Sequence, residues 1–150
     1  MIQRKQSLFL LFAFIATIVC LCLPVASISP VGMGGSIKLY NLCIVTSAGP
    51  NYSVCGLFGI LAMSSALSLG TIFLYHNRKL QMNLCVCNIF LLIAWFVVLG
   101  VTAHNTSPVD FSFNLTFTSC LPAVAAILVF MARAGVMHDE KLVRAADRIR

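Results

Sequence analysis

Four long apolar segments constrain this chain most, because each approaches the roughly 20 residues that a helix needs to cross a bilayer. The segments are residues 8–25, 55–75, 84–102 and 120–137. Only 9% of the 150 residues are charged, whereas a soluble domain carries about a quarter. The composition predicts an all-α integral membrane protein, with one four-helix transmembrane domain over residues 1–150 and a short cytoplasmic tail over 138–150.

The Lys and Arg residues follow the ends of these segments in a single pattern. If the segments form antiparallel hairpins, all but Lys38 fall on the same side of the membrane: Arg4, Lys5, Arg78, Lys79, Arg133, Lys141, Arg144, Arg148 and Arg150. Cytoplasmic loops of membrane proteins carry the excess of Lys and Arg, so the pattern predicts that both termini are cytoplasmic. The formal charge of +6 therefore indicates contact with membrane lipids, and nucleic acid is not expected as a partner.

The first segment must also be compared with a signal peptide, because Arg4 and Lys5 precede it. Its apolar run is longer than the usual h-region of about 7–15 residues. Leu23-Pro24-Val25-Ala26 is a poor cleavage site. We therefore expect an uncleaved anchor and a multi-pass protein.

Two connections that this topology places outside the membrane carry strand patterns. Residues 36–46 are rich in β-branched and aromatic side chains, which favours a strand, and residues 48–51 are typical of a turn. Residues 109–117 alternate between apolar and polar side chains, as a half-buried strand does. We expect the two strands to pair as a small outer β element. Phe111, Phe113 and Phe117 can also act as aromatic anchors at the membrane interface, and the two interpretations are compatible.

Few polar groups lie within the segments. Ala62, Ala66 and Gly70 recur at four-residue spacing, which allows a neighbouring helix to approach closely, and Asn88 is expected to hydrogen-bond across helices. No Asp, Glu, Lys or Arg lies in the middle of a segment. Ion-coupled transporters usually carry such residues, so the pattern argues against a pump but not against a passive or oligomeric pore.

The seven cysteines raise a metal or redox hypothesis that their spacing does not favour. Cys20 and Cys22 are two residues apart, as are Cys85 and Cys87, so a helix directs the members of each pair to nearly opposite sides. We expect these thiols to pack as small apolar groups, and we predict no catalytic residue, metal or cofactor.

Cys43 and Cys55 differ from the other cysteines because both fall in the outer region of the predicted topology. A disulfide between them can form in an oxidising compartment, provided that the two Cα atoms come close enough. The sequence leaves open whether this bridge forms.

Residues 139–150 are predicted to form a short helix with Leu142, Ala145, Ala146 and Ile149 on one face. Isolated helices shorter than about 12–15 residues are marginal in water, so this tail is expected to need a surface. Anionic lipid headgroups and a partner protein are the two candidates, and a frayed, solvated tail is the alternative. The predicted contact residues are Lys141, Leu142, Arg144, Arg148 and Ile149.

Three stretches carry a resemblance to a known family: Met1-Ile2-Gln3-Arg4-Lys5-Gln6, Asn77-Arg78-Lys79-Leu80-Gln81 and the tail that begins Asp139-Glu140-Lys141-Leu142. They resemble a family of small membrane proteins from Bacteroidetes that is known only as a domain of unknown function. The resemblance implies a four-helix protein of the inner (cytoplasmic) membrane of a Gram-negative bacterium. It implies neither a catalytic residue nor a substrate.

The sequence thus indicates a location more strongly than an activity. The leading hypothesis is a non-enzymatic accessory or scaffold subunit of a larger inner-membrane assembly, in contact with membrane lipids and other membrane proteins. One alternative is an oligomeric carrier or pore for a lipid or small apolar solute. The other is a membrane thiol-redox protein that uses Cys43 and Cys55.

Overall fold

The computed structural model describes residues 3–30, 36–46, 49–74, 77–106 and 111–148. Within these residues the helices are α1 (Gln3–Cys22), α2 (Cys55–Phe73), α3 (Arg78–Thr106) and α4 (Leu121–Arg148), with a short 3-10 helix, η1 (Phe117–Cys120), before α4. The strands are β1 (Ala26–Pro30), β2 (Ile37–Leu39), β3 (Ile44–Thr46), β4 (Gly49–Asn51) and β5 (Phe111–Leu115).

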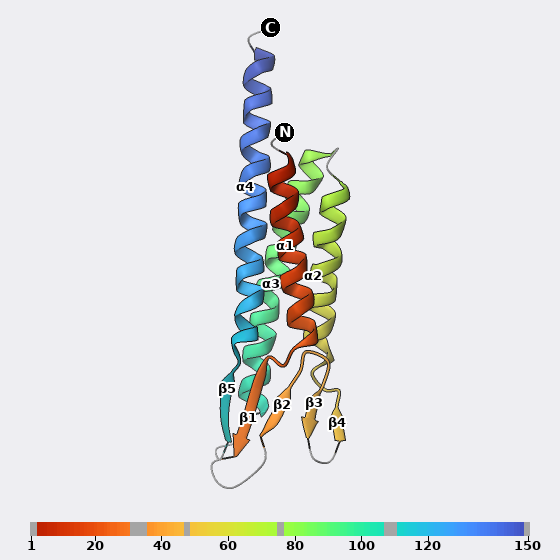
Figure 1. Ribbon diagram of the computed structural model, residues 1–150, viewed down its shortest axis with the longest axis vertical. Helices are drawn as coiled ribbons and strands as arrows, with labels where there is room; N and C mark the ends of the chain where they lie inside the picture. Colours follow the sequence, from red (N-terminus) through yellow and green to blue (C-terminus); the bar gives the residue numbers. More distant parts are fainter. Residues whose placement is uncertain (1–2, 31–35, 47–48, 75–76, 107–110, 149–150) are drawn as a thin grey trace.

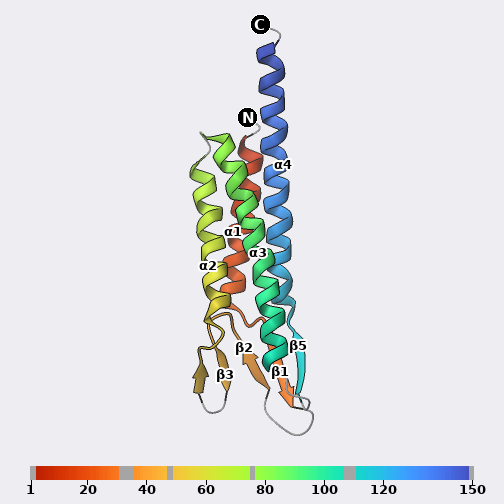
Figure 2. The same ribbon diagram turned by 180° about the vertical axis from the view of Figure 1, so that it is seen from behind.

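The four helices form an elongated up-and-down bundle in which each helix packs against two neighbours (Figures 1 and 2). α1 lies between α2 and α4, and α3 lies between the same two helices on the other side. The beginning of α1, the end of α2, the beginning of α3 and the last part of α4 lie at one end of the bundle, here called the basic end. All five strands lie at the opposite end, the sheet end, so Lys38 of β2 is separated from the other basic positions.

The outer surface of the bundle differs from that of a soluble protein, although its core is mainly apolar. Large apolar side chains cover its outer surface, for example Phe12 of α1, Met63 of α2, Phe90 of α3 and Ile127 of α4. Its interior includes buried polar side chains, among them Thr17, Ser64, Ser68, Thr71 and Asn88. Such an apolar exterior is unfavourable in water and compatible with the hydrocarbon of a membrane.

Three helices are long and apolar enough to cross a membrane: Cys55–Phe73, Lys79–Asn105 and Phe117–Leu142. The apolar part of α1, Gln6–Cys22, is shorter. The chain is therefore mostly helical, with a membrane-compatible bundle and a small antiparallel sheet.

The helix boundaries differ from the predicted segments in ways that local sequence explains. α1 ends at Cys22 rather than at residue 25, because the residue before Pro24 is disfavoured in helical conformation and the chain then enters β1. α3 already begins at Arg78, before the predicted segment at 84–102, and it ends at Thr106, beyond that segment. α4 continues without a break to Arg148, so the predicted tail helix is the end of α4 rather than a separate element.

The sheet has the order β4-β3-β2-β1-β5, and every neighbouring pair is antiparallel. The predicted strand at 36–46 is in fact a hairpin, β2 and β3, interrupted at Asn41. The predicted turn at 48–51 is also wrong in its described part, because Gly49–Asn51 form β4; Ala48 lies outside the described residues.

The predicted outer strand at 109–117 is confirmed in its central part as β5, but its predicted partner is wrong. β5 pairs with β1, where Ile28 faces Phe113, and not with residues 36–46. The helices explain this pairing: β1 follows α1, β5 precedes α4, and α1 and α4 are neighbours in the bundle. Val25, directly before β1, links β1 to β2 and to β5. Its N–H donates to Leu39 O of β2 (2.8 Å), and its carbonyl accepts from the N–H of Thr116, directly after β5 (3.0 Å).

The alternation that identified β5 corresponds to its two faces only in part, because the apolar Leu115 is 63% exposed. Phe113 is half-buried, whereas Ser112 and Asn114 are exposed and hydrogen-bond to Ser29 of β1. Phe117 is largely exposed in η1, which is compatible with an aromatic anchor at a membrane interface.

Candidate functional site

Asn41 attaches the sheet to the helical bundle. It lies in the β2–β3 connection, where Tyr40 N–H donates to Cys43 O (2.9 Å), and its side chain is buried. Asn41 Nδ2 donates to the backbone carbonyl of Cys20 (2.6 Å), and Asn41 Oδ1 accepts from Trp95 Nε1 (3.0 Å). Carbonyls in the last turn of a helix have no partner within the helix, so Asn41 caps α1 and binds α3 at the same time.

A second polar cluster joins α2 to α3 inside the bundle. Ser64 Oγ donates to Asn88 Oδ1 (2.5 Å), and Asn88 Nδ2 donates to Ser68 Oγ (2.8 Å). Ser68 Oγ in turn donates to the backbone carbonyl of Ser64 (3.0 Å). The prediction that Asn88 hydrogen-bonds a neighbouring helix is confirmed, and its amide is paired at both ends. The cluster therefore stabilises helix packing and leaves no free Asn88 atom for a ligand.

The small-residue stripe predicted to pack against a helix does not do so within this chain. Ala66 is exposed, Ala62 is only partly buried, and a Cβ added at Gly70 would meet nothing within 4 Å. The face of α2 that packs in the bundle is instead the one that carries Leu61, Ser64, Ser65, Ser68 and Thr71. The hydrogen bonds of Asn88 select this face, because they require the two serines to face α3.

At the basic end, α1 and α4 are joined through Gln6 and Asp139. Gln6 Nε2 donates to Asp139 Oδ2, and Gln6 is buried. Gly135, one turn earlier in α4, makes room for this side chain, because a Cβ at Gly135 would lie only 3.1 Å from Gln6 Cγ. This contact fixes which parts of α1 and α4 lie at the same level.

The seven cysteines are free thiols with unequal exposure. Cys20 and Cys85 are buried, whereas Cys22 and Cys87 are exposed, so each C-x-C pair does point to opposite sides as predicted. Among the described residues, no three His, Cys, Asp or Glu side chains gather as they would around a metal ion.

Cys43, half-buried beside β3, and Cys55, exposed at the start of α2, are likewise free in the structure. A disulfide between them remains a prediction.

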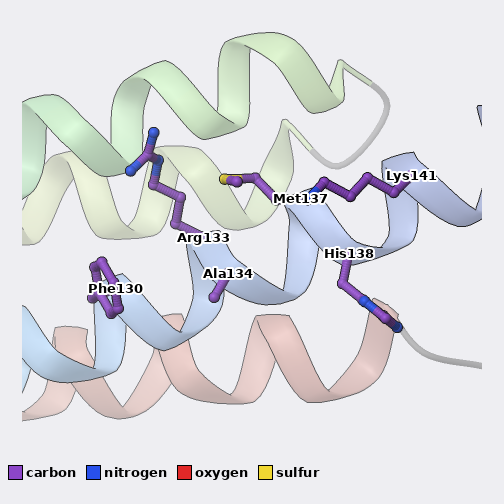
Figure 3. A pocket seen from close by; sticks show the side chains of 6 residues that line it. All are labelled: Phe130, Arg133, Ala134, Met137, His138 and Lys141. Carbon is purple, nitrogen blue, oxygen red and sulfur yellow. The ribbon is translucent and has the colours of Figure 1, made fainter.

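A hollow of about 290 Å³ lies on α4 close to the basic end, lined by Phe130, Arg133, Ala134, Met137, His138 and Lys141 (Figure 3). In this view the side chains of Arg133, Met137 and Lys141 extend on the α3 side of α4, and the Lys141 ammonium is directed toward Met137. His138 extends instead toward the start of α1. Phe130 lies at the opposite end of the hollow from Lys141.

The charge in this hollow is positive. Arg133 and Lys141 are permanent cations, and the described lining residues include no carboxylate. Arg133 Nε is buried and has no hydrogen-bond partner among the described residues. Arg133 was predicted only as a marker of topology, but it is followed in α4 by Ala134, Gly135, Val136 and Met137 before the polar residues begin at His138, so this cation lies inside the apolar part of α4.

The last part of α4 extends past the other helices at the basic end (Figure 1). Lys141 and Leu142 are exposed there, and their contact with a partner or with lipid stays a prediction. The side chains of Arg144 and Arg148 are not described, and Ile149 lies outside the described residues.

Sequence reasoning missed three of these features. Asn41 is one polar residue within a predicted strand, Gln6 and Asp139 are far apart in the chain, and Arg133 was grouped with the basic residues that mark topology. Only the last had a usable signal, since Arg133 lies inside the predicted segment 120–137, four residues before its end.

A comparison with curated proteins gives no match for this chain. A family model covers nearly all of it, from residue 2 to residue 149, and therefore spans the four helices, the sheet and the α4 extension together. The chain belongs to this family, which is described as a domain of unknown function (DUF4293).

Proposed function

We propose that this protein is a non-enzymatic subunit of a bacterial inner membrane, which crosses the bilayer four times and binds a partner protein through the extension of α4. The apolar exterior of the bundle supports the membrane location, and the exposed extension supports the partner. The polar groups inside the bundle support a packing role rather than chemistry, because Asn88 and Asn41 are fully engaged with other parts of the chain.

The four-span proposal includes α1, although its apolar part is the shortest. α1 packs against both α2 and α4, so it lies beside two helices that are long enough to span. Leu11, Phe12 and Ile15 are exposed on its outer side, and they would contact lipid if α2 and α4 do. A bilayer can also adapt to the short apolar part of α1, because it thins locally around a short helix at a modest cost in free energy.

The orientation follows from the charges at the basic end. We expect a cysteine placed at Gln3 or at Arg150 to be protected from a membrane-impermeant maleimide in intact spheroplasts, because positive ends face the cytoplasm. Lys38→Cys is the matched control at the sheet end and is expected to react. The measurement is labelling of single-cysteine variants in a cysteine-free background, before and after the membrane is opened. Reaction of the Gln3 or Arg150 variant in intact spheroplasts would contradict this topology.

The extension is the observation that carries the partner proposal. Gln6 and Asp139 lie at one level, but α1 begins only three residues before Gln6 whereas α4 continues to Arg148. At 1.5 Å per residue, α4 therefore projects roughly 9 Å beyond α1. Leu142, three residues after Asp139, lies at the base of this projection and is 50% exposed. Because the extension continues α4, it needs no separate nucleation to be helical, so its helical state alone does not indicate a bound partner. The exposed apolar side chain of Leu142 is what indicates a contact surface.

The test is a truncation that spares the α1–α4 contact. We expect deletion of residues 141–150, which keeps Asp139 and Glu140, to leave membrane insertion unchanged and to abolish the recovery of a partner protein in mild detergent. Leu142→Ser should weaken recovery through the apolar contact, and Arg144→Glu with Arg148→Glu should weaken it through charge. Lys79→Glu, at the same end but on α3, is the control and should retain the partner. If the truncated chain recovers every partner in undiminished amount, the extension is not the contact surface.

A further inference from the structure

The hollow around Arg133 combines three features that the bundle does not otherwise explain. It carries two permanent cations without a described carboxylate, it contains a buried nitrogen without a partner, and its walls include Phe130, Ala134 and Met137. Buried polar atoms are nearly always hydrogen-bonded, so an orphaned guanidinium nitrogen indicates a missing acceptor. An acceptor that suits both the cations and the apolar wall must itself be amphiphilic.

The position of Arg133 along α4 further restricts the kind of ligand that this hollow can bind. Arg133 lies roughly 18 Å from the start of α4 and roughly 9 Å before Asp139, at 1.5 Å per residue. If the apolar part of α4, which ends at Met137, spans the bilayer, Arg133 lies in the hydrocarbon near its cytoplasmic side. A cation at such a depth is costly unless it reaches the interface or meets an anion. Lys141, two turns further along, lies where headgroups would be.

We propose that this hollow binds the phosphate of an anionic phospholipid between Arg133 and Lys141. The inference rests on the proposed membrane location. In Figure 3 the Lys141 ammonium points back along α4 toward Met137, on the same side of α4 as the Arg133 guanidinium, so both cations line the same side of the hollow, one on each side of Met137. Arg133 supplies the planar, multidentate donor that matches phosphate oxygens, and Lys141 supplies a point charge.

The apolar residues place the acyl chains of this lipid. Phe130 is 59% exposed and lies in the hollow on the side away from Lys141, toward the middle of the span. Ile127, almost one turn earlier on α4, is equally exposed. A lipid with its phosphate at Arg133 would therefore lay its chains along Phe130 and Ile127. The volume of about 290 Å³ lies just below the range for ligand sites, roughly 300–1,000 Å³, which suits a headgroup whose chains lie outside.

A free phosphate ion is the other source of the same chemistry, but it fits the site less well. A small anion would leave the exposed Phe130 face uncovered and would have to leave bulk water to reach Arg133. A phospholipid is already at this depth, and its chains replace others on the same helix surface. The lipid therefore accounts for the apolar wall and the charges together.

The experiment is native mass spectrometry of the full chain in mild detergent, titrated with phosphatidylglycerol, with phosphatidylcholine or with inorganic phosphate. We expect phosphatidylglycerol to bind at least tenfold more tightly than phosphatidylcholine. In Arg133→Gln/Lys141→Gln we expect its affinity to fall about 30-fold, which corresponds to ~1 kcal/mol for each basic residue. Arg133→Lys, which keeps the charge, should lose less, and Lys79→Gln with Lys38→Gln should bind as the native chain does.

Each of these results tests the lipid site separately from partner binding and from membrane topology. Equal binding of the two lipids, or an undiminished preference in Arg133→Gln/Lys141→Gln, would overturn the site. Competition by inorganic phosphate at the same concentration as the lipid would show a simple anion site and would also overturn it. The maleimide labelling of the termini is independent of these outcomes, so a failed lipid site and a failed membrane topology are distinguishable.

Discussion

Trp95→Ala is expected to destabilise the bundle by about 3–5 kcal/mol, the largest effect of any single truncation considered for this protein. Trp95 is the largest fully buried side chain, and it contributes both packing on α3 and a hydrogen bond to Asn41. Its removal leaves a cavity beside a sheet that is attached through the same side chain. The measurement is the midpoint of unfolding in mixed detergent–sodium dodecyl sulfate micelles, followed by helical circular dichroism.

The matched control is Phe90→Ala on the same helix. Phe90 is 67% exposed, so its ring contacts detergent or lipid in the folded state and in the denatured state alike. Its truncation should change stability by no more than about 0.5 kcal/mol, as surface substitutions usually do. Equal losses for the two variants would mean that Trp95 is not in the core of the folded protein.

The helices of this fold could be predicted from the sequence because hydropathy encodes them directly. Boundaries were less accurate where a single residue decides them, as Pro24 does at the end of α1. The extent of α4 was also underestimated, since the change from apolar to charged residues after residue 137 resembles a boundary although nothing there interrupts a helix. Composition marks where a helix leaves hydrocarbon, but it does not mark where the helix ends.

The sheet could be predicted only in part, for a different reason. The alternation of β5 was visible, but β1 is five residues long and ends at Pro30, so it shows little strand pattern. The pairing of β5 with β1 depends on α1 and α4 being neighbours, and no local pattern states which helices are neighbours. Strand pairing is thus a consequence of helix packing in this chain.

The packing face of α2 shows how one polar residue can outweigh a pattern of small ones. Small residues are common on all sides of membrane helices, so Ala62, Ala66 and Gly70 identified no unique face. Asn88 has the stronger requirement, because an amide in an apolar bundle must be hydrogen-bonded, and Ser64 and Ser68 satisfy it. The sequence named Asn88 correctly and did not identify its partners.

Asn41→Ala is expected to cost about 2–4 kcal/mol and to loosen the sheet from the bundle. The substitution leaves the Trp95 indole N–H and the Cys20 carbonyl without their partners, and an unsatisfied buried group costs roughly 1–3 kcal/mol. The chain contains one tryptophan, so the emission of Trp95 reports directly on this junction. We expect a red shift of that emission if water reaches the indole, together with a lower unfolding midpoint.

Asn114→Ala is the control, since Asn114 is exposed and its amide bonds only at 3.3 Å to Ser29 Oγ among the described contacts; its loss should fall within about 0.5 kcal/mol. A double-mutant cycle then separates the hydrogen bond from packing. Trp95→Phe keeps an aromatic ring but removes the N–H, so Asn41→Ala should cost less in that background. The coupling energy is expected to be about 0.5–3 kcal/mol, the range for residues in contact. Strictly additive losses would mean that Asn41 and Trp95 act independently and that the hydrogen bond between them does not contribute to stability.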